Sequence, residues 1–131
     1  MGLEPYLIAA VLRCSVAQRL VRKLCKKCIK IYKANKRIMQ LYQRYGIKSD
    51  AMFITEGCPE CNYAGYKGRT IVAEVFQVDT EIEKMISMQK PMGEIKKYAI
   101  KNDMQPIAFD ALQKVSEGIT SFEEVEREVL F

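Results

Sequence analysis

The sequence predicts an α+β fold that is mostly helical, with a short β hairpin or small sheet and a subdomain organised by four cysteines. Three observations support this prediction. Apolar residues recur at helical spacing in most segments, β-branched residues gather in Thr70–Val78, and cysteines occur in two Cys-x-x-Cys pairs. With 131 residues, of which 49% are hydrophobic, the chain can bury a modest core, and a bound metal would help a region that lacks one.

The first element is predicted to be a helix from about Pro5 to Leu24. Proline suits the first position of a helix, where its missing N–H would have no partner in any case. Leu12, Val16, Leu20 and Leu24 then recur every four residues, with arginine and lysine at positions between them. This spacing predicts one apolar face on an amphipathic helix.

The middle of the chain, residues 25–69, is predicted to be a metal-binding module with a helix and a strand between its cysteine pairs. Asn35 can cap this helix at its start, and Gly46 can end it in a left-handed conformation. The strand is predicted over Ala51–Thr55, and the glycine-containing turn 62–69 lacks the spacing of a phosphate-binding loop. The apolar face of the predicted helix carries Ile38, Leu41, Tyr42 and Tyr45.

The last part of the chain, residues 70–131, is predicted to begin with the strand Thr70–Val78 and to continue with four helices. Thr80 and Glu83 have the spacing of a capping box at the start of the first helix. Proline, glycine and hydroxyl residues mark the other helix ends: Pro91 before the second helix, Pro106 and Gly118 around the third, and Thr120 or Ser121 at the start of the last.

The four paired cysteines offer a complete ligand set for one metal ion. A Cys-x-x-Cys turn lets two thiolates point at one centre, and two such turns close a tetrahedron around a soft divalent ion, normally Zn²⁺. A catalytic zinc keeps one position open for water and usually has histidine or carboxylate ligands, whereas this sequence contains no histidine. The sequence therefore predicts a structural zinc site formed by Cys25, Cys28, Cys58 and Cys61.

Other uses of the same cysteines remain open. An iron–sulfur cluster or a rubredoxin-like iron would use the same four ligands, and the 29 residues between the pairs do not forbid either. Disulfides are less favoured, because small secreted disulfide scaffolds are denser in cysteine and usually carry a recognisable signal peptide. A redox pair needs a thioredoxin-like βαβ context, which the sequence does not suggest. Cys14 stands apart and is expected to be a small buried hydrophobe.

Charge is divided unevenly along the chain. Between Arg13 and Lys48 there are twelve Lys or Arg and no Asp or Glu, whereas residues 70–131 contain twelve acids and seven bases. The net charge of +5 therefore combines a basic first part with an acidic last part. Such polarity favours docking to an anionic surface or to an acidic surface of another subunit, and it is equally typical of a solvated face.

Three stretches carry motifs more specific than the cysteine pairs alone. Val16–Cys28 contains QRLVRKLC, Gly57–Thr70 contains the pattern CPxCxxxGYxGR, and Lys114–Val125 reads KVSEGITSFEEV. Together these stretches resemble the C-terminal region of the ATPases of type II secretion and type IV pilus assembly, and the resemblance spans nearly the whole chain. Two departures are Ile71-Val72, where the family usually has Gly-Ile, and Ala111, where it usually has Gly.

The resemblance implies a bacterial ATPase that assembles as a homohexamer on the cytoplasmic face of the inner membrane, to which it is peripheral. Such ATPases drive pseudopilus or pilus extension through a polytopic inner-membrane platform protein and other subunits of the machinery. Their tetracysteine subdomain binds zinc and projects from a RecA-like ATPase core. Their ATP- and Mg²⁺-binding loop and acidic catalytic boxes precede the region that this chain resembles.

Carried over to this sequence, the resemblance divides the chain into three parts. Residues 1–24 would be the terminal helix of the ATPase core, residues 25–69 the tetracysteine zinc-binding subdomain, and residues 70–131 a strand followed by a C-terminal helical lobe. The chain is thus expected to be a fragment of a RecA-like secretion ATPase. Because the GxxxxGK[ST] spacing does not occur in it, the fragment is expected not to hydrolyse ATP by itself. The resemblance leaves the secretion and pilus branches undistinguished.

Two further sets of residues are functional candidates. Gln18 and Arg19 match the QRL motif, which in this family lies near the nucleotide-bearing face, although a position on a helix surface is the simpler expectation for each. No nucleophile–base pair or open metal site is evident, so no catalytic residue is predicted. The basic residues in and after the first cysteine pair are candidates for a docking surface: Lys26, Lys27, Lys33 and Lys36.

A zinc-ribbon-like nucleic-acid-binding module is the alternative function. Lysines within and after the first cysteine pair could contact phosphates, and Tyr32, Tyr42 and Tyr45 could stack on bases. The family resemblance argues against it. So does the helical spacing of Tyr42 and Tyr45, which predicts that these rings lie on an apolar face. No specific nucleic-acid partner is therefore expected.

Overall fold

The structure is a computed structural model that describes residues 2–129 and 131. The expected first and last parts of the chain each include one residue outside this range, Met1 and Leu130. The described residues form six α-helices, one 3₁₀ turn and four strands, which confirms the α+β prediction. They divide into two compact units, one made of the residues up to Ala17 with Glu74–Pro106, the other of Gln18–Ala73 with Ile107–Phe131. None of the described helices has the length and apolar character needed to cross a membrane.

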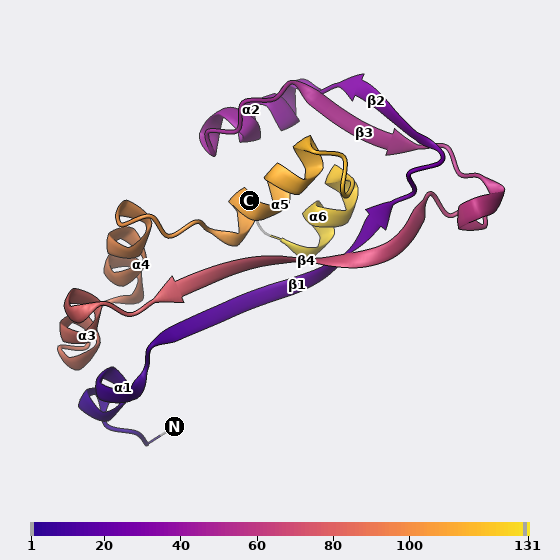
Figure 1. Ribbon diagram of the computed structural model, residues 1–131. Helices are drawn as coiled ribbons and strands as arrows, with labels where there is room; N and C mark the ends of the chain where they lie inside the picture. The colour runs from indigo at the N-terminus through magenta and orange to yellow at the C-terminus, as the bar shows by residue number, and fades with distance from the viewer. Residues whose placement is uncertain (1, 130) are drawn as a thin grey trace. The chain divides into compact units, whose positions relative to one another are not determined.

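Two long strands contribute to both units. β1 (Cys14–Leu24) pairs with β4 (Tyr66–Gln77) in a two-stranded sheet (Figure 1). In the first unit the Val78 N–H donates to the Arg13 carbonyl at 2.9 Å, and in the second the Cys25 N–H donates to the Gly65 carbonyl at 2.9 Å. Since these partners pair the end of each strand with the start of the other, the two strands are antiparallel.

The prediction of a single helix from Pro5 to Leu24 is wrong beyond its first two turns. The helix α1 (Pro5–Val11) ends at Leu12, which has extended backbone angles, and the following residues form β1. A spacing of four residues is close to one helical turn, but it is also a multiple of the two-residue period of a strand. Val16 and Leu20 therefore share one face of β1, where both are exposed, whereas Val21 on the other face and Leu24 at the end of the strand are buried.

The first unit is built from three helices around one small core. α1 contacts α3 (Thr80–Ser87), and α3 contacts α4 (Met92–Lys101). Ile82, Ile95 and Ala99 form its buried core. The predicted start of α3 is wrong by one residue, because Asp79 is the cap: its Oδ1 accepts the Ile82 N–H at 2.8 Å and its Oδ2 accepts the Tyr98 hydroxyl at 3.1 Å.

The second unit contains the segment between the two cysteine pairs. β2 (Ile29–Lys33), which the sequence analysis did not predict, pairs antiparallel with β3 (Ala51–Thr55), with Ile29 opposite Thr55 and Lys33 opposite Ala51. The helix α2 (Lys36–Arg44) lies between these strands in the sequence. Its predicted cap is confirmed, since the Asn35 side chain accepts the Ile38 N–H at 2.9 Å. Gly46 follows with the expected positive φ of 70°.

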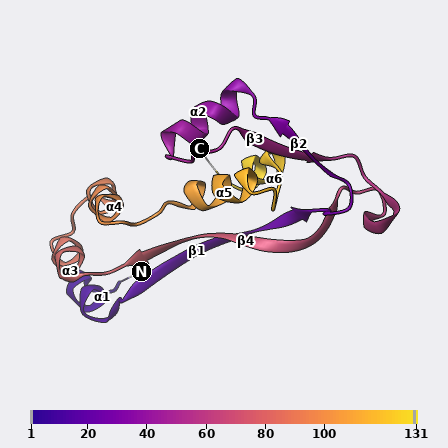
Figure 2. The same cartoon turned by 45° about the horizontal axis from the view of Figure 1, so that its top comes forward.

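The core of the second unit lies around two C-terminal helices. Both views place α5 (Ile107–Ser116) and α6 (Phe122–Glu128) between α2 with the β2–β3 hairpin on one side and the neighbouring parts of β1 and β4 on the other (Figures 1 and 2). Gly118 and the Ser121 cap delimit these helices as predicted. The fully buried core residues include one or more from each layer: Val21, Ile38, Tyr42, Val72, Leu112, Val115 and Val125.

An ion pair between a partly exposed arginine and a buried glutamate joins β1 to α6 within the second unit. Glu124 is only 5% exposed, and its carboxylate accepts the Arg22 backbone N–H at 3.1 Å, its Nε at 3.0 Å and its Nη2 at 2.8 Å. The Arg22 guanidinium also lies 4.1 Å from the ring centroid of Tyr66, on β4. The forked donor offsets part of the cost of burying this carboxylate, and the pair fixes how α6 lies against the sheet.

Candidate metal centre

The two cysteine pairs lie at the junctions between the two sheets. The first pair forms the turn between β1 and β2, and the second lies in the connection from β3 to β4, where Pro59–Cys61 form a 3₁₀ turn (Figure 1). Both chain crossings between the sheets therefore carry cysteines. The structure brings all four side chains together: the Sγ atoms of Cys25, Cys28, Cys58 and Cys61 lie within 4.8 Å of one another.

Three of the distances between sulfur atoms match those of a metal tetrahedron. Cys25 Sγ lies 3.8 Å from Cys58 Sγ, Cys28 Sγ 3.9 Å from Cys61 Sγ, and Cys58 Sγ 3.8 Å from Cys61 Sγ. Four sulfurs at about 2.3 Å from one zinc ion would be separated by about 3.8 Å along each edge. A disulfide would require about 2.05 Å, and all four cysteines are free. The residues present thus fit a tetrahedral ion.

The backbone of the second pair is bent by an unusual run of dihedral angles. Asn62 and Tyr63 have φ of 50° and 61°, and Gly57 has φ of 86°. These angles let the Tyr63 N–H donate back to the Cys58 carbonyl at 2.8 Å. A Cβ at Gly57 would come within 2.8 Å of the Tyr63 carbonyl oxygen. Only glycine therefore fits at Gly57, both for its dihedral angle and for the close approach of the backbone.

Gly65 connects the two pairs to each other. Its carbonyl accepts the Cys25 N–H at 2.9 Å, and its own N–H donates to Cys61 Sγ at 3.3 Å. A Cβ at this position would lie 2.3 Å from the Thr55 hydroxyl oxygen, and φ is 78°. Gly65 and Gly68, the two glycines of the segment 62–69, both have positive φ.

The hydrogen bonds of the cluster favour thiolates on some of its sulfurs. Burial opposes ionisation of Cys61, but N–H groups of Cys58 and Gly65 and neighbouring thiols donate to its sulfur and lower its pKa to about 6. Burial, aided by the adjoining cysteines and opposed by a hydrogen bond with the Gly57 backbone, raises the pKa of Cys28 to about 12. Four close thiolates repel one another, so the cluster needs a cation before all of them can ionise.

The chemistry of this donor set is that of a closed, soft site. Four sulfurs complete a tetrahedron, so no ligand position is left for water or substrate, and the arrangement suits a structural ion. When bound, zinc would link the β1–β2 and β3–β4 crossings through four metal–sulfur bonds. The protein contributes the orientation of those sulfurs, through the bent backbone at Gly57 and the N–H donors at Cys61.

The other candidate residues do not join this cluster. Gln18 and Arg19 lie on β1, where both are exposed and the Arg19 Nη1 donates to the Gln18 carbonyl at 3.0 Å. The expectation of a helix surface for them is wrong, although their exposure is as expected. Cys14 is also on β1 and exposed, which contradicts its predicted burial. The proposed docking lysines are all exposed and are spread over the first cysteine turn, β2 and α2: Lys26, Lys27, Lys33 and Lys36.

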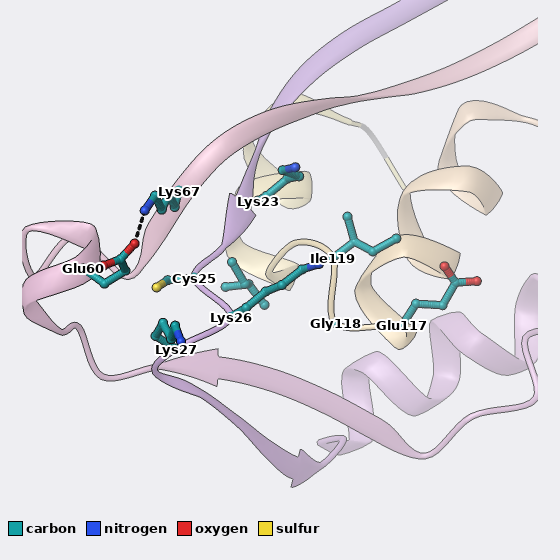
Figure 3. Close-up of a pocket in the computed structure, with 10 residues that line it drawn as sticks. Lys23, Cys25, Lys26, Lys27, Glu60, Lys67, Glu117, Gly118 and Ile119 are labelled. Atoms are coloured by element: carbon teal, nitrogen blue, oxygen red, sulfur yellow. Dashed lines mark hydrogen bonds and ion pairs between the residues drawn. The ribbon is translucent and has the colours of Figure 1, made fainter.

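Sequence reasoning missed a pocket of about 680 Å³ beside the first cysteine pair (Figure 3). Lys23, Lys26, Lys27 and Lys67 line it together with Glu60 and residues 117–119 of the loop between α5 and α6. Its lysines flank the cysteine turns in the sequence, and that proximity was the available signal. The loop between α5 and α6 is more than fifty residues away along the chain, so only the fold brings it there.

Comparison with known proteins places the whole arrangement in one family. The family described as Type II/IV secretion system protein matches residues 1–127. The chain is 39% identical over 127 residues to the type II secretion system ATPase E of Vibrio cholerae, covering 97% of this chain and 25% of that protein. It is 36% identical over 131 residues to the type IV pilus assembly ATPase TfpB of Acinetobacter baylyi, covering 98% of this chain and 22% of that protein.

A third relative extends the same similarity to another pilus protein. The type IV pilus assembly ATPase PilB of Thermus thermophilus is 36% identical over 130 residues, covering 95% of this chain and 14% of that protein. The chain thus spans a quarter or less of the length of these curated relatives, which include both secretion and pilus ATPases. From the family match and these identities, this chain belongs to the Type II/IV secretion system protein family.

Proposed function

We propose that this chain is the C-terminal region of a bacterial ATPase that powers type II secretion or type IV pilus extension. Within it, residues 25–69 form a zinc-stabilised module that couples the ATPase to its partners. Support comes from the relatives, which are named as secretion and pilus assembly ATPases, and from the tetrahedral geometry of the four sulfurs. The sulfur geometry carries the proposal, because it gives the module a physical reason to be rigid.

The proposed coupling role follows from where the cysteines lie. The segment of β2, α2 and β3 leaves and rejoins the β1–β4 sheet only through the two cysteine turns. A structural zinc site contributes an apparent ~10–16 kcal/mol to folding in small modules, more than enough to hold both turns together. Under this proposal a displacement of β1 and β4 moves the whole segment with its exposed lysines instead of bending the turns.

The partners and location follow from the same proposal. The complete ATPase would be a homohexamer, cytoplasmic and peripheral to the inner membrane, and would act on a polytopic platform protein and other machinery subunits. The basic residues Lys26, Lys27, Lys33 and Lys36 would form its docking surface. Nucleotide and Mg²⁺ would bind outside this chain, near enough for Gln18 and Arg19 on β1 to lie beside the nucleotide-bearing face. The chain by itself would neither bind nor hydrolyse ATP, because no stretch of it has the spacing of a phosphate-binding loop.

The three parts of the chain are proposed with the same boundaries as before, and only the secondary structure of the first part changes. Residues 1–24 remain the part proposed to belong to the ATPase core, as a helix followed by a strand in place of one helix. Residues 25–69 remain the tetracysteine subdomain and residues 70–131 a strand with a helical lobe. A nucleic-acid-binding module is less well supported, because Tyr42 is buried in the core and its hydroxyl donates to the Ala51 carbonyl at 2.9 Å.

The proposal is tested by metal analysis and by one substitution. The reduced chain should carry one zinc ion, and Cys58→Ser should lose it, whereas Cys14→Ser, which removes an exposed cysteine outside the cluster, should keep it. In the proposed complete ATPase, Cys58→Ser should spare nucleotide binding and reduce secretion or pilus extension. Less than half an equivalent of zinc, or iron in its place, would overturn the metal assignment. Full transport activity of the Cys58→Ser ATPase would overturn the coupling role.

A further inference from the structure

The pocket beside the first cysteine turn has a marked excess of positive charge. Lys23, Lys26, Lys27 and Lys67 face two acids, and both acids are already engaged. Lys67 forms an ion pair with Glu60, as the dashed line in Figure 3 shows, and Glu117 accepts the Gln113 side-chain amide at 3.1 Å. Within the described residues, Lys23, Lys26 and Lys27 form no ion pair. Because the Gln113 amide is neutral and leaves the charge of Glu117 in place, three lysines face one carboxylate and the pocket keeps a net positive charge.

The pocket also has an apolar wall, whose segments are joined by a backbone hydrogen bond. Leu24 and Ile119 line the pocket, and the Leu24 N–H donates to the Ile119 carbonyl at 2.9 Å. Gly68 allows the stem of Lys23 to lie across β4, since a Cβ there would come within 3.1 Å of Lys23 Cε. In Figure 3, Lys26 extends toward the loop at Gly118 and Ile119. The pocket thus offers an apolar wall edged by flexible ammonium groups.

We propose that this pocket binds an acidic protein segment that inserts one apolar side chain between its carboxylates. This inference rests on the proposed coupling role and names the chemistry of the partner: Asp or Glu residues flanking a leucine-like residue, supplied by another subunit of the machinery. A volume of about 680 Å³ accommodates a few residues of an extended segment and is far too small for a folded domain. The carboxylates meet the lysines, and the apolar side chain meets Leu24 and Ile119.

The wall of the pocket is poorly suited to phosphate. Phosphate sites commonly use free backbone N–H groups or the planar fork of arginine. Here the N–H groups of Leu24, Cys25, Glu117, Gly118 and Ile119 all donate to carbonyls within the fold. No arginine lines the pocket. Lysines on flexible stems suit carboxylates whose spacing varies along an extended chain.

The test measures binding of a defined peptide to the zinc-loaded chain. The probe is the blocked pentapeptide EDLDE, followed by calorimetry and by amide chemical shifts of the protein. The variant K23Q/K26Q/K27Q should weaken binding by about tenfold or more. The matched control K48Q/K97Q/K101Q removes the same charge from exposed lysines outside the pocket and should change binding by less than about threefold. The amide chemical-shift changes caused by the peptide should be largest at Lys23, Lys26, Lys27 and Ile119.

Each alternative predicts a different result. Equal weakening by the two triple variants would show a diffuse field and would overturn the pocket. Equal binding of the neutral peptide QNLNQ would overturn the requirement for acids, and equal binding of EDSDE would overturn the apolar contact. Stronger binding of tripolyphosphate or of an oligothymidylate at the same residues would replace the proposal with a phosphate site. Lack of binding of EDLDE at millimolar concentration would also overturn it.

These outcomes are separable from the test of the proposed function. If Cys58→Ser abolishes transport while EDLDE does not bind, the coupling role stands and the pocket proposal fails. If EDLDE binds the pocket while Cys58→Ser leaves transport intact, the pocket exists but does not serve coupling. Because Lys23, Lys26 and Lys27 are exposed side chains, their replacement by glutamine is not expected to unfold the chain, and the zinc content of the triple variant verifies this.

Discussion

The four cysteines form the candidate metal centre, but the groups that orient them are glycines and backbone N–H groups. Cys61 Sγ receives N–H groups from Cys58 and Gly65, each at 3.3 Å, so its thiolate is stabilised before any ion binds. The Gly65 carbonyl simultaneously holds Cys25. One residue without a side chain therefore couples the two cysteine turns, and its replacement should affect the metal more than the fold.

We predict that Gly65→Ala weakens zinc binding by about tenfold or more, as loss of groups that orient metal ligands typically does. The added Cβ would lie 2.3 Å from the Thr55 hydroxyl oxygen, so the backbone must shift away from Cys61 and Cys25. Gly46→Ala is the matched control: φ is also positive, at 70°, but nothing lies within 4 Å of its Cβ. It should cost about 1 kcal/mol of folding free energy without changing zinc affinity. Competition with a chromophoric chelator measures the zinc affinity of each variant. Equal zinc affinities in the two variants would contradict this prediction.

Residue identity predicted which four cysteines lie together but not their surroundings. The four cysteines could be grouped from spacing alone, because a Cys-x-x-Cys turn has few other uses with a second copy nearby. The clash that requires glycine at position 65 involves Thr55, whose approach depends on the folded β3. Cys14 was predicted to be buried only because its segment was taken for an amphipathic helix. On β1 it is exposed.

At the scale of elements, capping and turn residues predicted where helices begin and end. The spacing of apolar residues was less reliable in predicting whether a segment is a helix or a strand. Asn35 and Ser121 cap their helices as expected, because a side-chain oxygen competes for the first N–H groups wherever a helix begins. The four-residue spacing before Leu24 could not distinguish helix from strand. The outcome depends on pairing with β4, which lies more than forty residues further along the chain. The residues of β1 alone therefore do not show that the segment pairs with β4.

We predict that Asp79, and not Thr80, stabilises the start of α3. Asp79→Ala removes the acceptor of the Ile82 N–H and of the Tyr98 hydroxyl, and should lower the free energy of unfolding by about 1–2 kcal/mol. Thr80→Ala places a stronger helix former at an exposed position and should change the free energy of unfolding by less than about 0.5 kcal/mol. Urea denaturation monitored by circular dichroism gives both values. A larger loss for Thr80→Ala would restore Thr80 as the cap.

The ion pair between β1 and α6 should make stability depend on pH. The Arg22 side chain, hydrogen-bonded to Glu124, outweighs burial and holds the pKa of that carboxyl below its usual value. Its contribution is therefore complete above the unfolded-state pKa of about 4.3 and is lost as the pH falls through the lower folded-state value. Glu124→Gln should cost about 2 kcal/mol at pH 7, and the difference from the wild type should shrink below pH ~4.

The exposed neighbour on the same helix provides the control for this pH dependence. Glu123→Gln removes the same charge from the first turn of α6, without the bonds to Arg22, and should cost less than about 1 kcal/mol at pH 7. Denaturation at matched pH values compares each variant with the wild type, so loss of metal in acid affects both sides of the comparison. A cost of Glu124→Gln that does not vary between pH 7 and pH 3.5 would mean that the carboxylate charge contributes nothing.

For the molecule as a whole, the two units differ in what holds them together. The first has an apolar core at Ile82, Ile95 and Ala99 and contains no paired cysteine. The second has a larger apolar core, but its second cysteine turn stands outside it: in residues 56–65 only Cys61 and Gly65 are buried, and Tyr63 is 73% exposed. Little apolar contact could keep that turn folded. Its order is therefore left to its hydrogen bonds and, under the proposed function, to a bound metal.

We therefore predict that removing the metal unfolds a defined segment and leaves both apolar cores in place. After chelation of the reduced chain, hydrogen exchange should lose protection in the cysteine turns, residues 25–28 and 57–65, because four unneutralised sulfurs repel and no apolar cluster compensates. Protection in α3 and α4 should stay within about threefold of the metal-loaded value, since their core contains no ligand. Cys14→Ser, with its cluster intact, should respond to chelator in the same way as the wild type. Loss of protection across both units at once would show that the metal sustains the whole chain, and retention throughout would show that the cysteine turns do not depend on it.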